Sequence, residues 1–268
     1  DVVILGILSS VEAVTAYTLT KYLPETLISI IAISVVGIIP GLGGIIGSGD
    51  IKKATQVRSE IIALSWLLTT IVGCAILLWN HSFLGLWVGN DRYSGTLANF
   101  LIIVSVAQYI MIRTDGFIID LTLRIQKIFL YGVLSIAITV IAAIILVKYF
   151  QLGTIGVLIS LIFGRSILSF TYPTIVGRFL GVSLISQLKS ILRPLLVMLL
   201  LFTSAATLDS LVFNPHLSGL AGWGSLILYV GISTLLIILL SYFLGLTRRQ
   251  QKKIMLRIQI VLSPDKIN

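Results

Sequence analysis

The segment IFLYGVLSIAITVIAAIILV, residues 128–147, contains twenty residues and no charged side chain. An α-helix of this length is about 30 Å long, which matches the hydrocarbon core of a bilayer. Comparable apolar runs recur along the chain between short polar segments. The sequence therefore predicts a polytopic helical membrane protein of the all-α class.

The composition of the whole chain agrees with this prediction. Of its 268 residues, 57% are hydrophobic and only 11% are charged. Soluble domains carry about 25% charged residues, because they must cover their surface with polar groups. This composition excludes a soluble enzyme, a disordered chain and a nucleic-acid-binding module, although the formal net charge is +9.

Polar breaks divide the chain into a short apolar stub at about 1–10 and about seven longer spans. We expect the spans at roughly 17–46, 59–79, 96–116, 128–147, 154–176, 194–208 and 223–245. The first span contains Pro40, which we expect to kink it. The chain then divides into a transmembrane bundle, residues 1–247, and a basic amphipathic cytoplasmic tail, residues 248–268. Because the chain opens inside an apolar run, we also expect it to be a fragment whose amino-terminal part is missing.

Lys and Arg are distributed unevenly over alternate loops. Fifteen lie on one side of the predicted bundle, and only Lys21, Arg92 and Lys148 lie on the other. The positive-inside rule therefore places the basic side and the carboxyl terminus in the cytoplasm.

Two segments have patterns with more than one interpretation. Residues 183–193 alternate apolar and polar side chains, which predicts either a short helix on the cytoplasmic surface, ending where Pro194 opens the next span, or an ordinary basic flank. The glycine-rich segment 41–49 lacks the Lys-Ser/Thr of a phosphate-binding loop. Gly37 and Gly41, and likewise Gly43 and Gly47, stand four apart, which favours close helix packing.

Reactive side chains form no catalytic or metal-binding constellation in the sequence. Cys74 is the only cysteine, and His81 and His216 are far apart and lack neighbouring ligands. Asn80-His-Ser82 matches a glycosylation triplet, a match that is frequent by chance. We therefore expect neither an enzyme nor a bound cofactor or metal.

Polar residues inside the predicted spans are the candidate site. Arg165 lies near the middle of span 154–176, where a charged side chain costs at least about 2.5–3.5 kcal/mol. Ser169 and Tyr172 follow it at helical spacing. A second stripe, on span 96–116 and its cytoplasmic extension, consists of Ser105, Tyr109, Arg113, Gly116, Asp120 and Arg124.

From these two faces we predict a substrate-binding set. Its members are Arg165, Ser169, Tyr172, Arg113, Asp120 and Arg124. For Arg113 and Arg124, a structural interpretation is equally open, in which they pair with Asp120 or simply flank the membrane. For Arg165, which is too deep to reach the interface easily, binding is the favoured interpretation.

Several short motifs occur in a characteristic order. They are Asp1-Val-Val-Ile-Leu-Gly6 followed by Tyr17, Pro40 near a span end, Gly49-Asp50 with Lys52 and Lys53, Leu86-Trp87-Val88-Gly89, and Gly153-Thr-Ile-Gly156-Val157. In order, spacing and sidedness they resemble the Wzx-type oligosaccharide-lipid flippases of bacterial cell-surface polysaccharide synthesis. These flippases belong to the MOP superfamily, together with MATE drug exporters and MurJ lipid II flippases. The resemblance covers about residues 1–160, and beyond Gly177 it extends only to hydropathy and span count.

The resemblance implies the carboxyl-terminal lobe of a fourteen-span transporter in the bacterial inner membrane. Its cargo would be an undecaprenyl-pyrophosphate-linked oligosaccharide for polysaccharide or O-antigen (lipopolysaccharide) synthesis, with cationic cavity residues holding the pyrophosphate. The implied partners are this cargo, the lipid bilayer and polysaccharide-synthesis enzymes. Two rival hypotheses are a MATE-like drug or cation antiporter of the same fold and a non-transporting scaffold for a synthesis complex.

Overall fold

The computed structural model describes residues 1–121, 125–212, 219–248, 250–252 and 255. Within these ranges all regular elements are helices. In chain order they are α1 (Val2–Leu8), α2 (Val11–Val36), α3 (Ile39–Gly47), α4 (Ile51–Trp87), η1 (Asn90–Arg92), α5 (Thr96–Leu121), α6 (Ile125–Ile144), η2 (Ile145–Tyr149), α7 (Gly153–Leu180), α8 (Leu184–Val212), α9 (Gly219–Leu240) and η3 (Ser241–Gly245). The short elements η2 and η3 are π-helical turns that extend α6 and α9.

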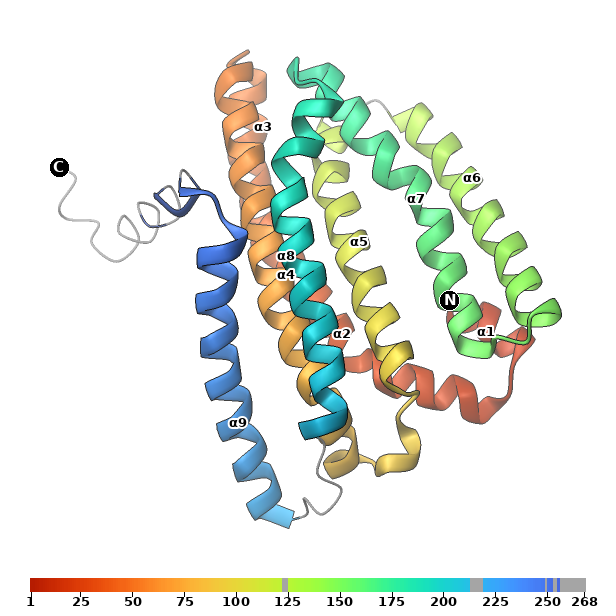
Figure 1. Cartoon of the computed structure of the whole chain (residues 1–268). Helices are drawn as coiled ribbons and strands as arrows, with labels where there is room; N and C mark the ends of the chain where they lie inside the picture. The colour runs from red at the N-terminus through yellow and green to blue at the C-terminus, as the bar shows by residue number, and fades with distance from the viewer. Residues whose placement is uncertain (122–124, 213–218, 249, 253–254, 256–268) are drawn as a thin grey trace.

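Six of the described helices are long and apolar enough to cross a membrane. They are α4, α5, α6 with η2, α7, α8, and α9 with η3. They stand side by side with alternating direction in Figure 1. This arrangement confirms an all-α polytopic membrane bundle, and each predicted span from residue 59 onward lies within one of these helices.

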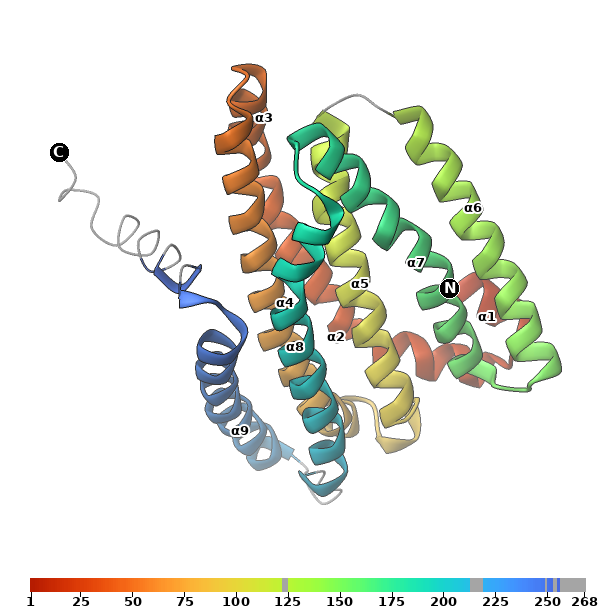
Figure 2. The same ribbon diagram turned by 45° about the horizontal axis from the view of Figure 1, so that its top comes forward.

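The first predicted span, residues 17–46, is not one kinked helix, and this prediction is wrong. The chain breaks between α2 and α3 at Gly37 and Ile38, and Pro40 lies in the first turn of α3, where its missing N–H leaves no helical bond unmade. In both views α2 crosses obliquely behind α5 and α4, which it contacts (Figures 1 and 2). Of the charged residues of α2, Lys21 is half-buried against the bundle, whereas Glu12 and Glu25 are exposed.

Basic residues gather at one end of the bundle, which we call the basic end. Lys52 and Lys53 lie in the first turn of α4, Arg178 in the last turn of α7, and Lys189 near the start of α8. These helix ends all lie at the top of Figure 1. The alternation of basic and non-basic ends agrees with the predicted alternation of the loops, and that the basic end faces the cytoplasm stays a prediction.

The helix α8 runs without interruption through Pro194, so the predicted separate surface helix at 183–193 is wrong. Its first turns are partly buried because Gln187 reaches into the bundle and is only 4% exposed. A proline inside a membrane helix is tolerated where neighbouring groups compensate for the missing hydrogen bond.

The closest helix contacts do not involve the glycine-rich segment, and the packing prediction for residues 41–49 is largely wrong. Among the described glycines of that segment, only Gly43 has a neighbour, Leu121, within 4 Å of where a Cβ would stand. One of the tight glycines is instead Gly164 of α7, where a Cβ would lie 2.8 Å from the backbone oxygen of Ser135 on α6. The Ser135 hydroxyl also donates to the Gly164 carbonyl at 2.9 Å. This contact holds α6 against the face of α7 that adjoins Arg165.

Candidate functional site

A cavity of about 80 Å³ lies between the start of α1 and helices α2, α5 and α7. Six polar side chains line it, together with four apolar ones. The polar ones are Asp1, Tyr17, Lys21, Ser105, Tyr109 and Arg165, and the apolar ones are Ile28, Ile102, Val106 and Leu158. The cavity therefore combines apolar walls with a few convergent polar groups, as ligand sites do.

The cavity lies deep along the helices that form it. Arg165 comes twelve residues after the first residue of α7, which is about 18 Å along the helix axis. Ser105 comes nine residues after the first residue of α5, about 14 Å along. Both residues therefore lie in the middle part of a membrane-crossing helix.

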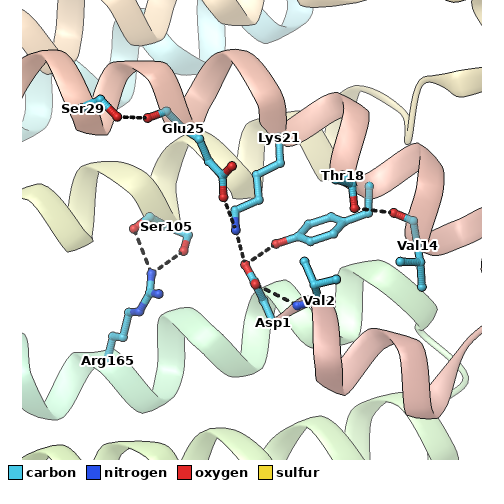
Figure 3. Close-up of polar contacts among 10 residues, drawn as sticks. Asp1, Val2, Val14, Thr18, Lys21, Glu25, Ser29, Ser105 and Arg165 are labelled. Carbon is cyan, nitrogen blue, oxygen red and sulfur yellow. Dashed lines mark hydrogen bonds and ion pairs between the residues drawn. The ribbon is translucent and has the colours of Figure 1, made fainter.

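Arg165 is half-buried and makes few polar contacts. Its Nη1 donates to Ser105 Oγ at 2.9 Å and, over a longer distance, to the Ser105 carbonyl at 3.4 Å (Figure 3). Its guanidinium carbon lies 5.4 Å from the centre of the Tyr109 ring, within cation–π range. In the described part of the chain no carboxylate forms an ion pair with it. Its charge is thus held by dipoles and an aromatic face.

The carboxylate that lines the cavity is already engaged. Asp1 Oδ2 accepts hydrogen bonds from Tyr17 Oη at 2.6 Å and from Lys21 Nζ at 2.7 Å (Figure 3). Its Oδ1 accepts from the Val2 N–H at the start of α1. Lys21 also pairs with the exposed Glu25 at 2.9 Å. The lining side chains therefore carry two positive charges and one negative charge, and the acid is paired with the lysine.

Two of the predicted partners of Arg165 lie elsewhere. Ser169 donates to the Arg165 carbonyl at 3.2 Å within its own helix and accepts from Gln108 Nε2 at 3.2 Å. The Tyr172 ring packs beside Gly116 of α5, 3.4 Å from where a Cβ would stand. Neither residue lines the cavity. Helical spacing correctly placed Ser169 and Tyr172 on one face of α7 with Arg165. At these two residues, however, that face packs against α5 and does not line the cavity.

The stripe predicted on span 96–116 divides into two parts. Ser105 and Tyr109 contact Arg165, as described above. Arg113 and Asp120 are exposed, lie 4.0 Å apart and form an ion pair, with the Arg113 guanidinium 4.4 Å from the Phe117 ring. This favours the structural interpretation of Arg113. Arg124 lies outside the described residues.

The cavity residues from α1 and α2 were missed by the sequence reasoning. Tyr17, Lys21 and Glu25 repeat every four residues, and such residues share one face of a helix. This spacing was the signal that could have identified them. Their partner Asp1 could not have been found in this way, because that contact depends on the return of α2 past α1.

Another arginine, Arg58, directly precedes the predicted span 59–79, and it is buried inside the bundle. Its Nε and Nη2 donate to the two carboxylate oxygens of Asp115, both at 2.8 Å, and Nη2 also donates to Gln187 Oε1 at 2.8 Å. Gln187 Nε2 in turn donates to the carbonyls of Pro173 and Val182 at 3.1 and 3.3 Å. This network ties α4, α5, α7 and α8 together near the basic end.

Two further findings concern metal binding and relatives. The described residues contain no group of three or more His, Cys, Asp and Glu side chains that could hold a metal ion. Comparison with known proteins returned no match to any family model, curated protein or solved structure.

Proposed function

We propose that the chain is the carboxyl-terminal lobe of a transporter that moves an undecaprenyl-pyrophosphate-linked oligosaccharide across the bacterial cytoplasmic membrane. The observation that carries the proposal is Arg165, a mid-membrane arginine that faces a cavity and has no carboxylate partner among the described residues. In this proposal Arg165 contacts the diphosphate of the cargo.

The chemistry of the guanidinium suits a diphosphate. An arginine has five N–H donors in a planar fork and stays charged at any physiological pH. The hydrogen bonds of Arg165 within the described chain use Nη1 alone. The remaining donors are available for two parallel bonds to phosphate oxygens, which are strong because both partners are charged.

Lys21 supplies a second positive charge in the same cavity. Figure 3 shows Lys21 on α2 and Arg165 on α7 extending towards the same space, with Ser105 beside Arg165. Because Lys21 is paired with Asp1 and Glu25, it contributes less to anion binding than Arg165 does. Lys21 therefore serves as an auxiliary contact for the cargo.

One observation favours the rival antiporter of organic cations, namely the Asp1 carboxylate in the cavity. An exporter of cations needs a carboxylate that can be uncovered, whereas Asp1 accepts from both Lys21 and Tyr17. The rival scaffold hypothesis requires no cavity chemistry, so it predicts that loss of Arg165 is harmless.

The test compares Arg165→Ala, Arg165→Lys and Arg178→Ala in cells, scoring surface polysaccharide against the amount of membrane-inserted protein. We expect very little export with Arg165→Ala and partial export with Arg165→Lys, because lysine keeps the charge but loses the fork. Arg178 is exposed at the basic end, so its replacement serves as the matched control and should leave export normal. Normal export by Arg165→Ala at normal abundance would refute the proposal and favour the scaffold.

A further inference from the structure

Gln108 is a polar side chain in the middle part of α5, and the proposed function does not use it. Its Nε2 donates hydrogen bonds to the Ile162 carbonyl at 3.0 Å and to Ser169 Oγ at 3.2 Å, both on α7. Because a carbonyl oxygen can only accept, the amide nitrogen of Gln108 and not its oxygen must face Ile162. One amide group therefore joins α5 to α7 through two hydrogen bonds.

The two acceptors of Gln108 belong to residues on either side of Arg165 in the chain. A helical carbonyl points towards the carboxyl end of its helix, and a helical side chain leans towards the amino end. The Ile162 carbonyl and the Ser169 hydroxyl therefore approach each other at the level of Arg165. Gln108 thus bonds to α7 at the turn that carries the arginine.

This turn of α7 contains features that make a helix easy to bend. Ser166 Oγ donates to the Ile162 carbonyl at 2.8 Å, and Ser169 Oγ donates to the Arg165 carbonyl at 3.2 Å. Hydroxyls that bond to the carbonyl four residues earlier often bend a helix, and Gly164 in the same turn has a low helix propensity. A bond from a neighbouring helix therefore helps to fix the direction in which Arg165 points.

Neighbouring residues of α5 hold the arginine side chain itself. Ser105 precedes Gln108 by three residues and accepts from Arg165 Nη1 at 2.9 Å (Figure 3). Tyr109 follows Gln108 directly, and its ring centre lies 5.4 Å from the guanidinium carbon of Arg165. Rotation of α7 by the angle between consecutive residues, about 100°, would break both contacts and turn the guanidinium away from the cavity.

The amide of Gln108 is only half satisfied. Its Oε1 is buried and has no hydrogen-bond partner among the described residues. A buried polar atom without a partner costs free energy, and an apolar side chain of the same length would avoid this cost. Packing alone therefore does not explain a glutamine at this position, whereas its two donor bonds to α7 do.

We propose that Gln108 is a positioning residue, which fixes the rotation of α7 so that the Arg165 guanidinium stays directed into the cavity. The inference rests on the proposed function, because this positioning matters for transport only if Arg165 contacts the cargo. Gln108 is not among the residues that line the cavity, so it acts on the cargo through Arg165.

The first measurement is the affinity of the purified full chain, in detergent, for undecaprenyl diphosphate. Gln108→Met keeps the side-chain length and removes both donors, so we expect the affinity to fall about threefold to tenfold. In the Arg165→Ala background the same change should cause no further loss, because no guanidinium is left to position. The matched control is Ser233→Ala, which removes a 2.9 Å hydrogen bond with Trp79 between α4 and α9 and should bind like the wild type.

A second measurement reports the direction of position 165 without any cargo. In a Cys74→Ala protein, Arg165→Cys introduces a single thiol, which a hydrophilic methanethiosulfonate reagent modifies at a rate set by its exposure to the cavity. Because Gln108 bonds to Ile162 and Ser169 and not to the arginine, its effect persists in this background. We expect Gln108→Met to slow the modification at least about threefold. Ser169→Ala, which removes one of the two acceptors, should slow it by a smaller factor.

Size-exclusion chromatography and melting temperatures establish whether each variant is folded, and if Gln108→Met is not, then Ser169→Ala decides. The positioning role is overturned if folded Gln108→Met changes neither the affinity nor the rate of modification. It is also overturned if Gln108→Met weakens binding equally with and without Arg165, because an equal loss indicates a purely structural residue. If the wild type does not bind undecaprenyl diphosphate, the proposed function fails, and the rate of thiol modification still decides the role of Gln108.

Discussion

Two arginines of the described bundle, the buried Arg58 and the half-buried Arg165, are held in opposite ways. Arg58 is 5% exposed and donates three hydrogen bonds of 2.8 Å to Asp115 and Gln187. Arg165 faces a cavity and, among the residues that the structure describes, donates only to Ser105. Both lie on helices long enough to cross the membrane, Arg58 nearer the basic end and Arg165 in the middle part of its helix. The two arginines differ in how many guanidinium N–H groups are already hydrogen-bonded to the protein. A structural arginine has most of them bonded, whereas a candidate binding arginine keeps several for a ligand.

The largest effect should follow from breaking the Arg58 network. Arg58→Ala leaves Asp115 buried without its counter-charge, and we expect a loss of about 3–5 kcal/mol in the free energy of unfolding. Denaturant unfolding of the purified protein in detergent measures this loss.

A double variant separates the ion pair from its packing. Replacing both partners, Arg58→Met with Asp115→Leu, removes the uncompensated charge, so most of the lost stability should return. If Arg58→Ala cost less than about 1 kcal/mol, as exposed pairs do, Arg58 would not be the structural arginine of the pair.

An intermediate effect should follow from loosening the helix that carries Arg165. Gly164→Ala would place a methyl group against Ser135 and Thr139 of α6, and such overpacking costs about 1–3 kcal/mol. Gly44→Ala, at a helical position with open space, is the matched control and should not destabilise the protein. The melting temperatures of the two variants in detergent provide the comparison.

If Gly164→Ala melted at the same temperature as Gly44→Ala, the close contact between α6 and α7 would not exist. Arg165 would then lack the rigid support that this contact gives to its helix.

The smallest effect should come from Arg113, whose exposed ion pair with Asp120 spans 4.0 Å. Arg113→Ala should change the free energy of unfolding by less than about 1 kcal/mol, because such pairs contribute little in water. Export should also remain near normal if the stripe on α5 acts only through Ser105 and Tyr109. Thermal unfolding and surface polysaccharide, both measured on this variant, check the two expectations. A strong export defect at normal stability would indicate that Arg113 does belong to the substrate-binding set.

The membrane-crossing helices could be predicted from the sequence because each depends on local composition. Runs of about twenty apolar residues locate a span whatever surrounds it, so α4 to α9 were found. The exception is α2 with α3, where the chain breaks at Gly37 just before Pro40, and where the partner of Lys21 on α2 is Asp1 from another segment.

The candidate site was predicted only in part, for a related reason. A charged residue in an apolar span is visible locally, so Arg165 was identified, and the stripe on α5 contained its contact Ser105. Its surroundings depend on contacts between residues far apart in the chain, such as Asp1 with Lys21 and Arg58 with Asp115. Helical spacing cannot reveal which side chain of another segment completes a charge, and this is why Ser169 was chosen and Asp1 was missed.

The most direct test of the role of Arg165 is the affinity of the purified protein for undecaprenyl diphosphate, measured for the wild type, Arg165→Ala and Arg165→Lys together with their melting temperatures. We predict that Arg165→Ala weakens binding at least about tenfold, or about 1.4 kcal/mol, while its melting temperature stays close to that of the wild type. Arg165→Lys should bind with intermediate affinity. Wild-type affinity in Arg165→Ala, or a loss of melting temperature as large as that of Arg58→Ala, would contradict the claim that Arg165 is reserved for an anionic cargo.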